Sequence, residues 1–266
     1  MTSNNTAIKV DNVIQFKVIT NQKEKKLRKD GQEKRTKSNK PEGVSSEVYA
    51  FKEKHEIAAI VDALNTDIMN ARDDNELFRA YRNKLLIIVG INIGIRASDL
   101  RNIKWSFFYN LDDNKGLHFK SFYTLQPQKQ RKTKKFIKLF FNDAVKKAVA
   151  EYLERFPITE DNLDDYVFCS TNGKSITVQQ MWNIINDIAK KAGIEQNVGT
   201  HSLRKTWGFW CWHTAQDKAK ALVVLQQCFR HNDALTTMRY IGIMDEEISD
   251  MYNSISLGFE NVLELD

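Results

Sequence analysis

The segment from Gly199 to Ile243 constrains the fold and chemistry of this 266-residue chain more than any other part of the sequence. His201 and Arg204 lie three residues apart in it, so on a helix both side chains are on one face. Thr200 precedes them and is predicted to be the N-cap, which would direct the free N–H groups of the first turn toward the same place. The segment therefore predicts a helix whose first turn gathers positive charge.

A histidine and a tyrosine follow in the second half of that segment. Tyr240 comes nine residues after His231. A phenol, two imidazoles and a guanidinium that converge on one place suit an anion under nucleophilic attack, because they supply a nucleophile, proton exchange and positive charge. Taken singly, His201 is more often a satisfied residue at a helix start and Tyr240 a half-buried packing residue, so the hypothesis depends on the whole pattern.

Three boxes of the sequence resemble the tyrosine recombinases of the phage integrase family. HSLRKT is similar to the family's second box, His-x-x-Arg. FRHND with TTMRYIGI is similar to its third box, in which His or Trp is followed by Tyr nine residues on. Upstream, GINIGIRASDLRNIKW resembles the first box, where an arginine follows a glycine-containing turn and an acidic residue comes three later. Arg96 and Asp99 take those two positions. Three boxes in the right order, from about Gly90 to Ile243, make the resemblance specific.

The resemblance implies a role for each matching side chain. Tyr240 would be the nucleophile, His201 would accept its proton, and His231 would donate a hydrogen bond to the phosphate. Arg96 and Arg204 would neutralise the charge that grows on the phosphoryl oxygens, because a guanidinium stays charged near neutral pH and can donate two hydrogen bonds at once.

Asp99 and one lysine complete the implied set. Asp99 would hold a neighbouring basic side chain in place. The family holds a general-acid lysine at a β-hairpin, and counting back from the helical run that starts at Asn142 selects Lys132, with Lys129 and Lys134 as alternatives. Several basic side chains near the site are expected to contact DNA: Lys129, Arg131, Lys134, Lys205 and Arg230.

One departure from the family pattern precedes the third-box histidine. The family usually has glycine where this chain has Arg230, so the change indicates either a contact with a DNA phosphate or a local change of backbone conformation. The interval between Arg204 and His231 is also a few residues longer than usual, which we assign to the loop near residues 215–220.

The positive charge of the chain is concentrated near its amino end. Residues 22–40 contain nine Lys or Arg and three acidic residues, a difference of +6 that equals the net charge of the whole chain. We expect residues 1–46 to be a basic arm or linker, which is either a solvated tail or an arm that tracks DNA phosphates. Many relatives carry a helical core-binding domain there, so the arm replaces that lobe or the chain is a reduced member resembling the small DNA-inversion recombinases.

Residues 47–266 are expected to form the catalytic domain, beginning with helices. Apolar residues within 57–68 recur at the spacing of one helix face. The aspartates at 73–74 are predicted to cap a second helix that ends at Gly94, and Ser98 to cap a short helix over 99–103.

The centre of the chain changes character. Residues 105–141 are rich in aromatic and β-branched residues, with a turn at 112–116, and predict a small antiparallel sheet of about three strands. A short strand at 166–170 and a helix from Thr177 to about Ala192 follow. The predicted fold class is mainly α with a small antiparallel β-sheet (α+β), the catalytic fold of the tyrosine recombinases.

Several classes of protein are disfavoured by what the sequence lacks. There is no apolar run near 18 residues long, so we expect no membrane span. Three cysteines (Cys169, Cys211 and Cys228) are scattered without pair or metal spacing, which favours a reducing cytoplasm. No phosphate loop, zinc motif or acidic cluster suited to two magnesium ions is present, so we expect phosphate chemistry without a metal or other cofactor.

The resemblance predicts an enzyme that cuts and rejoins double-stranded DNA at specific sites through a covalent 3′-phosphotyrosine, without ATP. The expected context is integration, excision or resolution of a bacterial mobile element, in the cytoplasm and on the nucleoid, with accessory DNA-bending or directionality proteins as possible partners. Such enzymes act as tetramers. Ile248, Met251, Tyr252 and Ile255 form one side of an amphipathic run that would pack on a neighbouring protomer or on the chain's own core.

Two alternatives stay open at this stage. A type IB topoisomerase-like nicking-closing enzyme would use the same chemistry as a monomer. A DNA-binding regulator with a vestigial site would keep the fold without the reaction, although all six catalytic side-chain types can be placed.

Overall fold

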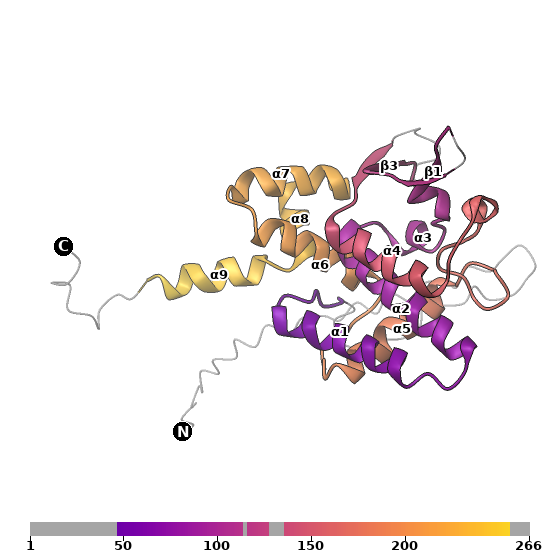
Figure 1. Ribbon diagram of the computed structural model, residues 1–266. Coiled ribbons are helices and arrows are strands. Elements are labelled where there is room, and N and C mark those ends of the chain that lie inside the picture. The colour runs from indigo at the N-terminus through magenta and orange to yellow at the C-terminus, as the bar shows by residue number, and fades with distance from the viewer. Residues whose placement is uncertain (1–46, 114–115, 128–135, 256–266) are drawn as a thin grey trace, which may run out of the picture. The chain divides into compact units, whose positions relative to one another are not determined.

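The helices around α2 form the framework of the protein (Figure 1). The computed structural model describes residues 47–113, 116–127 and 136–255. The predicted arm, including the possible strand within residues 8–18, lies outside the described residues, as do Lys129, Arg131, Lys132 and Lys134.

The two predicted amino-terminal helices are present as α1 (Lys54–Met69) and α2 (Asp74–Ile93). Asp73 caps α2 by accepting a hydrogen bond from the Glu76 N–H at 2.7 Å. Gly94 ends the helix in the left-handed region, at φ 67°. A Cβ at Gly94 would lie 2.2 Å from the Trp207 ring, so this position is confined to glycine both by its backbone conformation and by packing.

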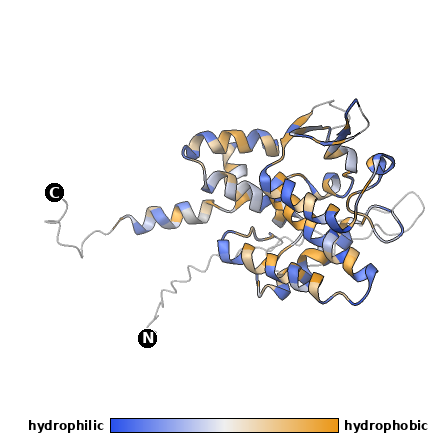
Figure 2. Ribbon diagram, in the orientation of Figure 1, coloured by the Kyte–Doolittle hydropathy of each residue, from blue (hydrophilic) through white to orange (hydrophobic). Residues whose placement is uncertain are grey.

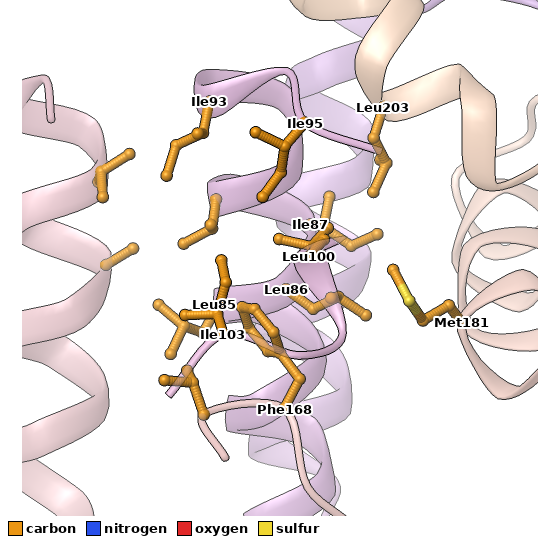
Figure 3. Packing of buried hydrophobic residues seen from close by; sticks show 14 of the residues in the cluster. Leu85, Leu86, Ile87, Ile93, Ile95, Leu100, Ile103, Phe168, Met181 and Leu203 are labelled. Atoms are coloured by element: carbon orange, nitrogen blue, oxygen red, sulfur yellow. The ribbon is translucent and has the colours of Figure 1, made fainter. Parts of the chain in front are cut away.

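Helix α2 packs against α1, α4 (Asp143–Arg155) and α6 (Thr200–His213) (Figure 1). Figure 3 shows Leu86 and Ile87 among the core side chains, with Met181 and Leu203 contributed by α5 (Val178–Lys191) and α6. A Cβ added at Gly90 would lie 2.5 Å from Leu203 Cδ1, so a glycine there permits the close approach of α6 to α2. The first box of the sequence is thereby held next to the helix that carries His201 and Arg204.

The predicted three-stranded sheet is wrong in its strand count. In the described part of the chain, four strands form two separate antiparallel pairs: β1 (Tyr109–Leu111) with β2 (Leu117–Phe119), and β3 (Phe122–Leu125) with β4 (Ile137–Phe140). The aromatic and β-branched residues indicate strands, but they do not show where one hairpin ends and the next begins. Here the break falls at residues 120–121, where the Lys120 N–H donates to the Phe108 carbonyl at 2.8 Å.

Two short elements also differ from the prediction. Helix α3 (Ala97–Leu100) has Arg96 at its N-cap position, so Ser98 is a helical residue and the helix ends before Ile103. A 3₁₀ helix, η1 (Trp105–Phe107), follows it. The predicted strand at 166–170 is reduced to two isolated bridges, because its backbone pairs with Lys104 and Ser175 at single positions only.

The carboxy-terminal half is helical. After η3 (Glu160–Asp164), α5 begins with Thr177 as its N-cap, as predicted, and three further helices follow α6: α7 (Lys218–Phe229), α8 (Ala234–Ile241) and α9 (Met244–Asn253). A second apolar cluster joins α6, α7 and α8. A Cβ at Gly208 would lie 2.5 Å from Phe229 and 2.8 Å from Ile241, so the three helices meet closely at that glycine.

Helix α9 carries hydrophobic residues interleaved with hydrophilic ones (Figure 2). The apolar side chains of the predicted amphipathic run are exposed: Ile248, Met251, Tyr252 and Ile255. The alternative in which this run folds on the chain's own core is therefore wrong for this structure. Among the described helices, none is both long and apolar enough to cross a membrane.

Candidate active site

The site is built on the first turns of α6. Gly199, not Thr200, is the N-cap of this helix, and its N–H donates to Ser202 Oγ at 3.0 Å. The predicted cap was wrong by one residue because Gly199 takes the extended conformation and the Ser202 hydroxyl folds back onto it. His201 and Arg204 are nevertheless both helical, as their spacing predicted.

Tyr240 meets both of these α6 side chains. Its hydroxyl lies 3.1 Å from His201 Nδ1, and the positive charge of the Arg204 guanidinium acts on it. Tyr240 lies in α8, which Gly242 ends in the left-handed region at φ 75°. The phenol is half-buried, whereas the His201 ring is exposed. The nucleophile, the proton acceptor and one arginine proposed from the sequence are thus brought together within one chain.

The surroundings of Tyr240 favour the neutral phenol. Burial raises the pKa of the Tyr240 hydroxyl above its ordinary value, and the positive charges of Arg204 and Arg96 oppose that shift only in part. At neutral pH the hydroxyl therefore keeps its proton, so a base is needed for attack, and His201 is in hydrogen-bond contact with it.

Backbone carbonyl groups hold the two arginines. Arg204 is buried and donates from Nη1 to the Gly94 carbonyl and from Nη2 to the Cys228 carbonyl at 3.4 Å. Arg96 is half-buried and donates from Nη2 to the Phe229 carbonyl at 3.5 Å. Burial lowers the pKa of Arg204 to about 10, so its guanidinium remains charged at neutral pH.

Asp99 lies buried on α3, close to these cations. Its negative charge raises the pKa of Arg204 and so opposes part of the effect of burial. The position of the Asp99 carboxylate is compatible with the predicted role of holding a basic side chain of the site in place.

The His231 ring also packs against the Tyr240 ring. The two ring centroids are 5.1 Å apart, and His231 Nδ1 lies 3.1 Å from the Thr237 hydroxyl. Burial lowers the pKa of His231, and the positive charges of Arg204 and Arg96 lower it further. The imidazole is therefore neutral at pH 7, and Nε2 is the ring nitrogen left to face a ligand when Nδ1 pairs with Thr237.

Arg230 precedes His231 in an unusual backbone conformation. It ends α7 at φ 59°, and among the described residues it is the one non-glycine residue with a positive φ. Glycine adopts this conformation without steric cost, which accounts for the glycine that the family pattern has at this position. Arg230 Nη2 donates to the Phe136 carbonyl at 3.4 Å. Arg230 therefore takes the backbone conformation that suits the family's glycine, and its contact with a DNA phosphate stays a prediction.

Lys205 does not lie where a DNA-contacting residue was expected. Its side chain is buried, its ammonium pairs with Glu47 at 2.5 Å, and it lies 5.5 Å from the centre of the Tyr240 ring. In this arrangement it is therefore a neighbour of the candidate nucleophile rather than a surface cation. The sequence indicated a basic residue beside the second box but gave no sign that an acidic partner lies so far upstream.

Two further contacts were not predicted. Thr237 orients His231, and Lys52 Nζ donates to the Gly242 carbonyl at 2.6 Å. The TTMRY run offers a local signal for Thr237, because it lies one helical turn before Tyr240. No local signal marks Lys52, which is 190 residues from its partner. Within the described part of the chain, no group of three or more His, Cys, Asp or Glu side chains could hold a metal ion.

Comparison with known proteins agrees with the fold. The model of the Phage integrase family matches residues 51–247, which is more than half of the chain, so the chain belongs to that family. Among solved structures, the XerA recombinase resembles it with a TM-score of 0.54 and 23% identity, over 82% of this chain and 66% of that one. The predicted fold class, the catalytic fold of the tyrosine recombinases, is thereby confirmed.

Two relatives give the extent of the similarity in sequence. The probable integrase/recombinase YoeC of Bacillus subtilis (strain 168) is 30% identical over 172 residues, covering 64% of this chain and 83% of the relative. Tyrosine recombinase XerC of Staphylococcus carnosus (strain TM300) is 25% identical over 174 residues. That match covers 65% of this chain and 53% of XerC, so the chain spans about half the length of this relative.

Proposed function

We propose that the protein cuts and rejoins double-stranded DNA at specific sites through a covalent 3′-phosphotyrosine at Tyr240. The observation that carries the proposal is the Tyr240 hydroxyl, which lies 3.1 Å from His201 Nδ1 and within the influence of the Arg204 charge. Membership of the Phage integrase family supports the same chemistry.

In the proposed cleavage step, the Tyr240 oxygen attacks the phosphorus of the scissile phosphodiester. The oxygen–phosphorus bond forms while the bond to the 5′-oxygen breaks, and the tyrosine proton passes to His201. Arg96 and Arg204 stabilise the charge on the phosphoryl oxygens, and His231 donates a hydrogen bond to one of them. Each such donor contributes about 100- to 1,000-fold in rate in comparable sites.

The departing 5′-oxygen needs a proton, which we assign to Lys132. This residue lies in the link between β3 and β4, outside the described residues, so its assignment depends on the family pattern. Rejoining reverses the step: a 5′-hydroxyl attacks the phosphorus of the phosphotyrosine and gives its proton to Lys132, while the bond to the Tyr240 oxygen breaks and that oxygen takes its proton back from His201. Because the covalent link conserves the bond energy, the proposed reaction needs no ATP. Positive charge comes from side chains, so we also propose that no metal cofactor takes part.

We propose that the protein assembles as a tetramer on DNA through its C-terminal segment. The exposed apolar side chains of α9 support this, because an unpartnered apolar face is suited to a second protomer. Integration, excision or resolution of a mobile element is the proposed biological context, supported by the description of YoeC as a probable integrase/recombinase. A location in the cytoplasm on the nucleoid, and accessory DNA-bending or directionality proteins, belong to the same proposal.

The test uses two differently labelled duplexes made from the ends of the genetic element that carries the gene. A recombinase yields joint molecules that carry both labels, and nicked duplexes trap a protein–DNA adduct. A topoisomerase-like enzyme yields the adduct without joint molecules. Binding of both duplexes with neither product, in the parent and in Tyr240→Phe alike, would mean that the site is vestigial.

A further inference from the structure

The segment Glu47–Lys52, here called the strap, runs along α6 just before α1 begins. The Tyr49 N–H donates to the Asn197 carbonyl at 2.8 Å, and the Phe51 N–H donates to the buried Thr206 hydroxyl at 2.8 Å. Trp210 Nε1 donates to the Phe51 carbonyl at 2.9 Å. The last two hydrogen bonds fix the strap to the helix that carries His201 and Arg204, and the first fixes it to the segment just before that helix.

The end of the strap also reaches the helix that carries the nucleophile. Lys52 Nζ donates to the Gly242 carbonyl at 2.6 Å and lies 5.4 Å from the centre of the Phe209 ring of α6. Gly242 is the turn residue that ends α8, two residues after Tyr240. Lys52 thus joins the end of α8 to the face of α6.

The other end of the strap, Glu47, is linked to the Tyr240 ring through the side chain of Lys205. Glu47 pairs with the buried ammonium of Lys205 at 2.5 Å, and that ammonium lies 5.5 Å from the centre of the Tyr240 ring. The two ends of the strap therefore act on the same helix, one at its terminal turn and one beside its tyrosine ring.

Helix α8 is short, and it is held by one face packed against α6 and α7 and by anchors at its ends. It spans Ala234–Ile241, and only Thr237 and Ile241 are buried along it. A helix of eight residues is too short to be stable in isolation, so its position is set by contacts at its ends and on its buried face. A charged donor at its carboxyl end also interacts favourably with the helix dipole.

We propose that Lys52 is a positioning residue for Tyr240: its hydrogen bond to the Gly242 carbonyl holds α8 against α6 with the tyrosine hydroxyl at His201. This inference rests on the proposed function of Tyr240 as the nucleophile. Lys52 acts through α8 and contacts neither DNA nor the reacting atoms. When this hydrogen bond is lost, α8 moves more freely relative to α6. The Tyr240 hydroxyl then spends less time in the position beside His201 from which it attacks the phosphorus.

The first experiment measures the position of α8 without any reaction. Hydrogen exchange is followed in peptides covering residues 234–243 of the full chain, for the parent, Lys52→Met, Lys52→Arg and Lys54→Met. Lys54 is the exposed first residue of α1 and serves as the matched control. Lys52→Met is expected to raise the exchange rate about tenfold, equivalent to about 1.4 kcal/mol. Lys52→Arg keeps a donor and restores protection, and Lys54→Met has no effect.

The second experiment measures adduct formation on nicked DNA at saturating protein, beside the DNA affinity at several salt concentrations. Lys52→Met is expected to slow adduct formation about tenfold while the affinity and its salt dependence stay unchanged. A weakened affinity with a shallower salt slope would show that Lys52 contacts a phosphate and would overturn the inference. Unchanged exchange in Lys52→Met would also overturn it, as would faster exchange with adduct formation at the parental rate.

The two experiments separate this inference from the proposed function. If the parent forms no adduct, the proposed function fails and with it the catalytic meaning of Lys52, whereas the exchange result still reports whether Lys52 anchors α8.

Discussion

Replacing Arg204 with lysine is the most informative single change, because it keeps one positive charge and removes the planar fork. The guanidinium donates to the Gly94 and Cys228 carbonyls, it lies 4.6 Å from the Phe229 ring centre, and its charge acts on the Tyr240 hydroxyl. An ammonium group is a compact point charge on a flexible stem and cannot reproduce this planar arrangement of donors. At least one of these acceptors would therefore lose its donor.

Two magnitudes follow from the geometry. A buried carbonyl left without a donor costs roughly 1–3 kcal/mol of folding free energy, so Arg204→Lys should destabilise the protein moderately. Loss of a donor to the developing phosphoryl charge costs about 100- to 1,000-fold in rate, which corresponds to about 2.7–4 kcal/mol of transition-state stabilisation. The loss of rate should therefore be larger than the loss of stability explains.

Arg82→Lys is the matched control. Arg82 is as buried as Arg204, and its Nη1 donates to the Cys169 carbonyl at 2.9 Å, but it contacts none of the site residues named above. Thermal unfolding and single-turnover adduct formation at pH 7 are measured for both variants. Both should unfold at lower temperature, while only Arg204→Lys should lose adduct formation by about 100-fold or more. Equal losses of rate in the two variants, or a parental rate in Arg204→Lys, would refute the reasoning.

Three further predictions concern the titrating groups and the origin of the nucleophile. Because burial raises the pKa of Tyr240, adduct formation by His201→Ala should climb about tenfold per pH unit from about pH 7 to 9, and a flat profile would count against His201 as the base. The folded-state pKa of His231 is depressed below its ordinary value of 6.5, so the unfolded chain binds more protons just below that pH, and stability is lost as the pH falls. Unfolding temperatures of His231→Gln should therefore depend less on pH between about 5 and 7 than those of the parent, and parallel curves would contradict this. Finally, the Tyr240 hydroxyl lies against the α6 helix of its own chain, 3.1 Å from His201, so a mixture of Tyr240→Phe and Arg204→Ala should form no adduct, whereas adduct on the Arg204→Ala chain would show donation between protomers.

Local signals allowed the helices to be predicted. The start of α5 was predicted because Thr177 is a residue type that caps helices, and α2 because Asp73 and Gly94 carry the cap chemistry at its ends. Such signals need only neighbouring residues. The break between the two hairpins was missed because pairing across a sheet depends on residues that a pattern of apolar side chains does not align.

The sequence predicted which side chains of the candidate site lie together, but not the contacts that hold them in place. The spacing of His201, Arg204 and Tyr240 identified the residues that the structure brings together, which the resemblance to the family made specific. The burial of Lys205 and the hydrogen bond of Lys52 could not be foreseen, because their partners Glu47 and Gly242 are 158 and 190 residues away in the chain. The position of Lys132 stays a prediction from the family pattern.

The most direct test of the account is to identify the residue that becomes linked to DNA. Protein trapped on a nicked duplex is digested with protease and nuclease, and the modified peptide is sequenced by mass spectrometry. The account predicts a nucleotide 3′-phosphate on the oxygen of Tyr240 and no modified peptide from Tyr240→Phe. A phosphate on another residue, or adduct formation that persists in Tyr240→Phe, would contradict it.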